Sequence, residues 1–197
     1  MSNPAACEPG RSDNVPATHE LVLAGFGGQG ILAMGQLLAY AGMLEEKHVS
    51  WLPSYGAEMR GGTANCTVVI SDEPVASPVS SRPSIVVAMN DPSLDRFEPT
   101  VRPGGLLLIN TSLCGRQARR QDVRVLEVPA TGIADELGEG RVANMVMLGA
   151  LLGATGLVGA QSVLESLAKV LPPRRHGLIP LNQRALLRGQ EIAARHS

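Results

Sequence analysis

Aromatic side chains are scarce in this sequence, in which Phe, Trp and Tyr together make up 3% of 197 residues. Proteins that bind single-stranded nucleic acid usually stack the bases on aromatic rings, so this composition argues against that class. No charge of one sign dominates either, since 17 Lys plus Arg face 18 Asp plus Glu. A balanced chain is not drawn to nucleic acid or to an anionic membrane surface, and we expect neither as a partner.

Paired cysteines and long apolar runs are also missing. Cys7, Cys66 and Cys114 stand far apart without a C-x-x-C pair, which excludes an iron–sulfur cluster or a structural zinc held by cysteines of this chain alone. Their pattern suits a reducing cytoplasm. Cys66 has no His nearby in the sequence, so we expect a buried inert thiol. No apolar run reaches the roughly 18 residues that predict a membrane span, and we predict no metal site and no catalytic residue.

The chain has the length of one domain of ordinary size, with no internal repeat and no linker that would divide it. Residues 1–19 lack the charged start and apolar segment of a signal peptide, and we interpret them as a disordered leader. Residues 20–197 are expected to form the domain.

The segment that organises the rest is 20–44, ELVLAGFGGQGILAMGQLLAYAGML. Its apolar run, glycine-rich turn and helical apolar spacing predict strand, turn and helix. Gly25, Gly27 and Gly30 fit G-x-G-x-x-G, and Gly28 adds a further residue without a side chain, so a phosphate group could approach the amides at the helix start. A strand-to-helix crossover whose glycines only permit close packing explains the same pattern. Both interpretations stay open.

A dinucleotide-binding fold needs an acidic residue at the end of its second strand, where it binds the ribose hydroxyls. Here the second strand is predicted at 48–52 and is followed by a turn that contains Pro53 and Ser54. Glu45 and Glu46 have roughly the required spacing, but they precede that strand. This mismatch disfavours an NAD-binding Rossmann oxidoreductase, which we keep as an alternative function.

The loop at 54–66, SYGAEMRGGTANC, is too polar and too rich in glycine to be core. Arg60 precedes two glycines, and its guanidinium donates hydrogen bonds in pairs, which suits an anionic ligand or a partner carboxylate. An internal pair with Glu58 that only fixes the loop is an equally good interpretation.

Strands and helices alternate along the remainder. Strands are predicted at 63–71, 84–90, 106–110 and 123–128, and helices at 93–101, 143–154, 161–171 and from Asn182 through Ala194. The segment 143–154 is apolar nearly all round, so we expect it to be buried against its own sheet or against another subunit. The pattern predicts the α/β class: a single-domain, three-layer sandwich with a Rossmann-like, mostly parallel sheet and a mixed edge near 63–71.

Five segments together resemble a known family. They are GFGGQG (25–30), PSYGAEMRGG (53–62), SDEPVASP (71–78), VAMN (87–90) and ANMVMLGALLG (143–153). The combination resembles the gamma subunit, or gamma domain, of the 2-oxoacid:ferredoxin oxidoreductases. The likeness runs from residue 21 to the last predicted helix.

Enzymes of that family decarboxylate a 2-oxoacid on thiamine diphosphate, reduce ferredoxin through iron–sulfur clusters and transfer the acyl group to coenzyme A. This chain has no GDG segment followed by an Asn pair for Mg-diphosphate binding. The resemblance therefore implies a hetero-oligomer in which alpha and beta subunits carry thiamine diphosphate and Mg. The iron–sulfur clusters are expected on partners, either on a ferredoxin-like delta subunit or on a separate cluster domain. The isolated chain is expected to be inactive. The resemblance favours 2-oxoglutarate over pyruvate, branched-chain oxoacids or aryl pyruvates.

In the family this domain is implicated in receiving coenzyme A. The coenzyme-binding positions implied by the resemblance are Gly25, Gly27, Gly28, Gln29, Gly30 and Arg60. A coenzyme A diphosphate needs backbone amides and a cation but no ribose-binding carboxylate, which agrees with the missing acidic residue. The alternative is a purely structural assembly subunit, whose glycine turn and arginine loop only pack against the alpha chain.

Overall fold

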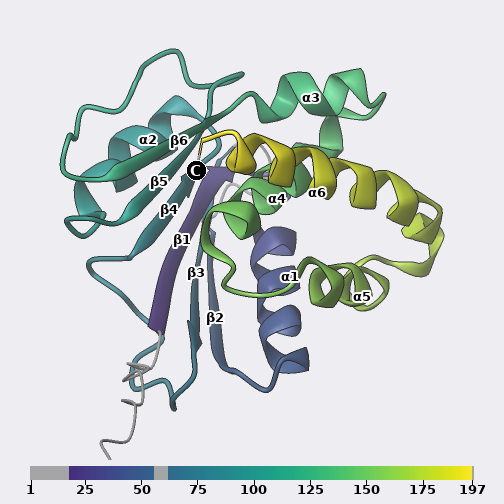
Figure 1. Cartoon of the computed structure of the whole chain (residues 1–197), viewed down its shortest axis with the longest axis horizontal. Coiled ribbons are helices and arrows are strands. Elements are labelled where there is room, and N and C mark those ends of the chain that lie inside the picture. Colours follow the sequence, from purple (N-terminus) through teal and green to yellow (C-terminus); the bar gives the residue numbers. More distant parts are fainter. Residues whose placement is uncertain (1–17, 56–61, 197) are drawn as a thin grey trace, which may run out of the picture.

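The computed structural model describes residues 18–55 and 62–196, and in these ranges the chain forms one six-stranded sheet with helices on both faces (Figure 1). The strands are β1 (Thr18–Phe26), β2 (His48–Tyr55), β3 (Thr63–Ser71), β4 (Ile85–Ala88), β5 (Leu106–Asn110) and β6 (Arg124–Val128). The helices are α1 (Ile31–Leu44), α2 (Asp91–Phe97), α3 (Ala130–Glu136), α4 (Ala143–Thr155), α5 (Ala160–Val170) and α6 (Ile179–Ala194). Short 3₁₀ turns lie at η1 (Glu98–Thr100), η2 (Gly140–Val142) and η3 (Pro173–Leu178).

The sheet has the strand order β2-β3-β1-β4-β5-β6. β1, β4, β5 and β6 run parallel, whereas β3 is antiparallel to both of its neighbours, β1 and β2. The predicted α/β class, the largely parallel sheet and the mixed edge near β3 are therefore confirmed. Some strand boundaries were predicted wrongly: β4 ends at Ala88 instead of residue 90, and β2 does not turn at Pro53 but continues to Tyr55. Because β2 lies at the edge of the sheet, a proline can occupy it without removing a hydrogen bond that the sheet needs.

Side chains of β1 alternate between two cores. Leu21 and Leu23 join the larger core under α1, α4, α5 and α6, while Val22 and Ala24 join a smaller core under α2. This period of two is what a strand covered on both faces requires. Figure 1 shows the unequal layers, with α1, α4, α5 and α6 on one face and α2 on the other.

Two helix starts illustrate the role of local chemistry. Asn90 precedes α2, and its side chain accepts a hydrogen bond from the amide of Ser93 at 3.0 Å, so the helix begins at this Asn-Asp-Pro segment. For the last helix, Asn182 was predicted as the cap but lies inside α6, where its Nδ2 donates to the carbonyl of Leu178 at 2.7 Å. The helix starts earlier because Pro180 fits its first turn, where no amide is needed.

Helix α4 is buried along most of its length, as predicted, and its contacts lie within the chain. It crosses α6 where glycines face backbone: a methyl group on Gly149 would lie 2.8 Å from the carbonyl carbon of Leu186, and one on Gly153 would lie 2.7 Å from Cβ of Ala193. Of the two interpretations left open by the sequence, packing against its own domain is the one observed. No helix in the described ranges has the length and apolar character that crossing a membrane requires.

Candidate functional site

The glycine-rich turn lies at the carboxyl edge of the sheet, between two parallel strands whose helices diverge. α1 follows β1 and packs in the larger core, while α2 follows β4 and packs in the smaller core on the opposite face. Open α/β sheets bind ligands where neighbouring connections diverge in this way. The turn and Asn90 therefore occupy the edge at which a ligand site is expected.

The surroundings of Gly25 and Gly30 in the turn differ from those of Gly28. A methyl group on Gly25 would lie 2.6 Å from Oε1 of Gln29, and one on Gly30 would lie 2.5 Å from Nδ2 of Asn144. Gly28 and Gly30 both have a positive φ, +97° and +76°, but Gly28 differs because a methyl group built on it would meet nothing within 4 Å. Close packing explains Gly25 and Gly30, whereas the bare surface at Gly28 is open to an approaching ligand.

Gln29 locks the turn in place. Its Oε1 accepts hydrogen bonds from the amide of Phe26 at 2.6 Å and from Nδ2 of Asn90 at 3.0 Å. Because Asn90 also caps α2, one side chain ties the turn after β1 to the helix after β4. Asn144 of α4 adds a further support by donating to the carbonyl of Gly30 at 3.3 Å. Sequence reasoning did not connect Asn144 with the turn, because the two lie 114 positions apart.

The first residues of α1 line a cavity, and their backbone amides are free in the described part of the chain. Within the described ranges, Ile31, Leu32 and Ala33 donate no amide hydrogen bond, and the first helical bond of this turn runs from Met34 to the carbonyl of Gly30 at 2.9 Å. The cavity measures about 480 Å³ and its lining includes those three residues. No acidic side chain stands in the first turn of α1, so nothing there offsets the positive end of the helix dipole.

The wall of this cavity combines donors with apolar surface. Besides the start of α1, it is lined by Phe26, Gly27, Gly28 and Gly30 of the turn and by Gly62, Thr63 and Ala64 at the start of β3. The amide of Gly27 is already bound to the carbonyl of Gly62 at 2.9 Å. The arrangement suits an anionic group that carries a slender, partly apolar chain. Arg60, predicted to be a cation near the turn, and Glu58 lie in segment 56–61, outside the described residues.

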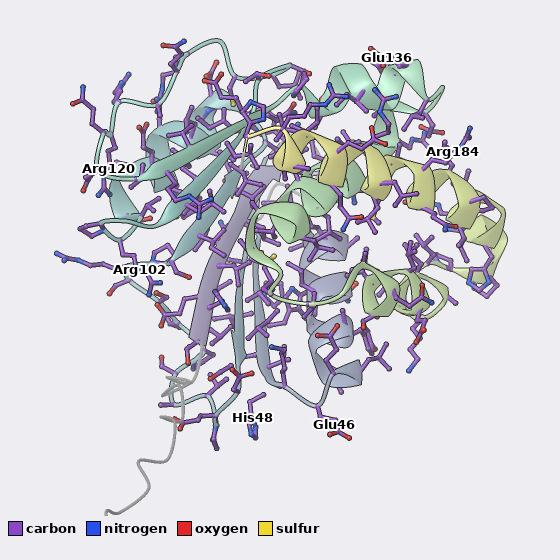
Figure 2. The ribbon with its side chains drawn as sticks, viewed as in Figure 1. Glu46, His48, Arg102, Arg120, Glu136 and Arg184 are labelled. Atoms are coloured by element: carbon purple, nitrogen blue, oxygen red, sulfur yellow. The ribbon has the colours of Figure 1, made fainter. Side chains whose placement is uncertain are left out.

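The carboxylates considered for a dinucleotide site lie far from this cavity. Glu45 follows the last turn of α1, which at about 1.5 Å per residue puts it roughly 20 Å from the glycines. Oε1 of Glu45 accepts a hydrogen bond from the amide of Gly159 at 2.6 Å. Glu46 points away from the fold at the end of the molecule opposite the glycine turn (Figure 2). At the end of β2, residues 52–55 contain no acidic side chain.

The described residues offer neither a reactive thiol nor a cluster of metal ligands. Burial raises the pKa of the Cys66 thiol and of the Cys114 thiol to about 12 in each case, so neither is a thiolate near neutral pH. Cys66 is fully buried, which confirms the expected inert thiol. Within residues 18–55 and 62–196, no group of three or more His, Cys, Asp or Glu side chains is arranged to hold a metal ion.

These features define a class: a Rossmann-like α/β domain that offers helix amides to an anionic ligand without the carboxylate of a dinucleotide site. The family model described as pyruvate ferredoxin/flavodoxin oxidoreductase matches residues 20–192. The chain belongs to this family, and the resemblance predicted from the sequence is confirmed at that level.

Among relatives, the ketoisovalerate oxidoreductase subunit VorA of Methanothermobacter marburgensis is 50% identical over 137 residues, which cover 68% of this chain and 28% of the relative. The 2-oxoglutarate synthase subunit KorC of Methanocaldococcus jannaschii is 36% identical over 177 residues, 88% of this chain and 93% of the relative. The chain thus spans less than a third of that VorA protein but nearly the whole of KorC.

Two solved structures share the fold. The gamma subunit of a keto/oxoacid ferredoxin oxidoreductase from Geobacter sulfurreducens has a TM-score of 0.77 and 26% identity, over 90% of this chain and 99% of that one. A 2-oxoglutarate:ferredoxin oxidoreductase from Magnetococcus marinus, with 2-oxoglutarate, coenzyme A and succinyl-CoA bound, has a TM-score of 0.82 and 22% identity, over 90% of this chain and 31% of that one.

Proposed function

We propose that this chain is the gamma subunit of a thiamine diphosphate-dependent 2-oxoacid:ferredoxin oxidoreductase and that its glycine-rich turn binds the diphosphate of coenzyme A. The observation that carries the proposal is the cavity at the start of α1, where the amides of Ile31, Leu32 and Ala33 have no acceptor within the described ranges. Family membership supports it, as does the coenzyme A in the Magnetococcus marinus enzyme of the same fold.

The work of this chain in the proposed reaction is binding and orientation. Free amides and the positive end of α1 would hold the diphosphate, Gly28 would let it approach the backbone, and the apolar wall that includes Phe26 would guide the pantetheine arm. When bound, coenzyme A supplies the thiol that accepts the acyl group. Gln29 acts behind the site by fixing the turn. The resemblance adds Arg60, which lies outside the described residues, as the proposed cation for the diphosphate.

The oxidative chemistry belongs to partner subunits in this proposal. Cys66 and Cys114 lie in the cores on opposite faces of the sheet and are buried, so they do not fit an iron–sulfur cluster. Alpha and beta subunits would carry thiamine diphosphate and Mg, and a ferredoxin-like chain would carry clusters. The exposed side chains of Tyr40, Met43 and Leu52 offer apolar surface for such assembly.

For the substrate we propose 2-oxoglutarate. The KorC relative supports this choice, because it is a 2-oxoglutarate synthase subunit matched over 93% of its length, as a separate chain of similar size. Purification of the native complex, followed by coenzyme A-dependent viologen reduction with each 2-oxoacid, tests the choice. Fastest reduction with a branched-chain oxoacid or with pyruvate would contradict it.

The coenzyme site is tested with Gly28→Leu in the assembled complex, with Gly104→Leu as its matched control. Both glycines have positive φ, +97° and +73°, and neither would bring an added methyl group within 4 Å of another atom. Each variant therefore bears a similar backbone cost of about 1–2 kcal/mol, but only Gly28 lines the cavity.

We expect Gly28→Leu to raise the KM for coenzyme A by about tenfold or more, since loss of one charge-assisted contact costs about 1.5–3 kcal/mol. Thiamine-dependent decarboxylation should persist, and Gly104→Leu should leave both quantities unchanged. An unchanged KM in an intact complex would contradict the proposal. If the turn only packs against the alpha chain, size-exclusion chromatography would instead show loss of assembly. Saturable binding of NADH by the isolated chain would revive the dinucleotide alternative.

A further inference from the structure

A second cavity adjoins the glycine turn on its other side. It measures about 200 Å³ and lies toward β4 and β5, whereas the cavity described above lies toward β3. Gly28 lines both cavities. Because its position carries no side chain and is exposed, a ligand can pass over the backbone there from one cavity to the other. We refer to these two cavities, which share Gly28, together as the groove across the turn.

The polar side chains around the second cavity are hydrogen-bond donors. Gln29 uses its Oε1 within the fold, and its Nε2 has no acceptor in the described part of the chain. Thr131 accepts a hydrogen bond from Nδ2 of Asn110 at 3.0 Å, which leaves its hydroxyl hydrogen to donate. Arg141 is the third polar side chain of the lining. Among the described residues that line this cavity there is no Asp or Glu.

The side chain of Arg141 contributes little to the stability of the fold. Its side chain is 79% exposed, and its ion pair is a 3.8 Å separation between its Nε and Oε1 of Glu139. The same Oε1 of Glu139 also accepts a hydrogen bond from the backbone amide of Arg141 at 3.3 Å. Exposed pairs of this length contribute little to stability. A guanidinium that is held so loosely at the rim of a donor-lined cavity suits a phosphate, which it can bind through two parallel hydrogen bonds.

We infer that Arg141 binds a second phosphate of the same ligand, at a subsite separate from the glycine turn. This inference rests on the proposed function, in which the turn holds the coenzyme A diphosphate. Coenzyme A carries one further phosphate, on its ribose. With the pantetheine arm in the apolar cavity toward β3, the nucleotide end crosses Gly28 and brings that phosphate to Gln29, Thr131 and Arg141.

The test compares coenzyme A with dephospho-coenzyme A, which lacks the ribose phosphate, as acyl acceptors for the assembled complex. Arg141→Gln is the variant, and Arg119→Gln is the matched control. The Arg119 side chain is 75% exposed and its ion pair with Asp95 also spans 3.8 Å, but Arg119 does not line the groove. We expect the wild-type KM to be at least about fivefold lower for coenzyme A than for dephospho-coenzyme A. Arg141→Gln should abolish this preference by raising only the coenzyme A value.

If Arg141→Gln changes the KM equally for both acceptors, or changes neither KM, the proposed role of Arg141 is wrong. The control variant should keep the wild-type preference, and a loss of preference there would overturn it as well. Gly28→Leu distinguishes this failure from failure of the proposed function, because it should raise the KM for both acceptors. If Gly28→Leu acts on both while Arg141→Gln leaves the preference intact, the coenzyme site stands and the second phosphate subsite is wrong.

Discussion

The crossing of α4 and α6 predicts how a single methyl group affects stability. A methyl group on Gly149 would lie 2.8 Å from the carbonyl carbon and 3.0 Å from Cα of Leu186, and it would overlap the carbonyl oxygen. All three are backbone atoms of a helix and cannot rotate away. Gly189 of α6 approaches the backbone of Val146 in the same manner. Gly149→Ala should therefore push the two helices apart.

The size of the effect follows from these distances. Non-bonded carbon atoms prefer separations of about 3.5–4.0 Å, so α6 must shift by about 1 Å. Overpacking a core costs about 1–3 kcal/mol, and we expect the upper value because the contact is with backbone. Alanine returns about 1 kcal/mol through its higher helix propensity. The net loss should be about 2 kcal/mol, or a fall in Tm of roughly 4–8 °C for a domain of this size.

Urea unfolding of the full chain, followed by circular dichroism, measures this loss. The control is Gly132→Ala in α3, where the nearest atom to an added methyl group is Oγ of Ser112 at 3.6 Å, an ordinary contact. This variant should be unchanged or more stable by up to about 1 kcal/mol. A Gly149→Ala chain as stable as the wild type, or an equal loss in the control, would refute the packing argument.

Two further predictions concern ionisable groups. Burial acts to raise the pKa of Glu98, but hydrogen bonds from the Arg120 amide and the Arg116 guanidinium outweigh it and lower that pKa. The ionised Glu98 carboxylate therefore stabilises the fold at pH values above its unfolded-state pKa of about 4.3. This stabilisation is lost as the pH falls through the pKa that Glu98 has in the folded protein. Glu98→Gln should therefore be less stable at pH 7 by about 1.5–3 kcal/mol, with a smaller difference at acid pH; a constant difference would contradict this. Burial raises the pKa of both thiols to about 12. Cys66 and Cys114 should therefore resist thiol reagents at pH 8 until urea unfolds the chain. Fast labelling of either thiol in the native protein would contradict this prediction.

Most of the fold follows from local patterns. Alternating and apolar runs predicted the strands, because these patterns depend on residues that are neighbours in sequence. The end of β2 depends on something else. Pro53 signals a turn locally, but its position on the sheet edge, set by pairing with β3, allows the strand to continue.

The site was predictable in outline only. GFGGQG predicted a glycine turn before a helix, but the pattern could not show which glycine is open to a ligand. That distinction depends on Gln29 reaching Asn90, 61 positions away, and on Asn144 reaching Gly30, 114 positions away. Arg141 carries no motif, and only the meeting of η2 with the turn places it beside Gly28. Contacts between distant segments determine such features, so composition and spacing do not contain them.

The proposed function requires that the amides at the start of α1 bind coenzyme A. Hydrogen–deuterium exchange of the assembled complex, with and without coenzyme A, tests it most directly because Ile31, Leu32 and Ala33 lack acceptors in the described ranges. We expect rapid exchange of these amides without the coenzyme and marked slowing in peptides that span residues 27–34 when it is bound. Slowing confined to other parts of the complex, with residues 27–34 unchanged at saturating coenzyme A, would contradict it.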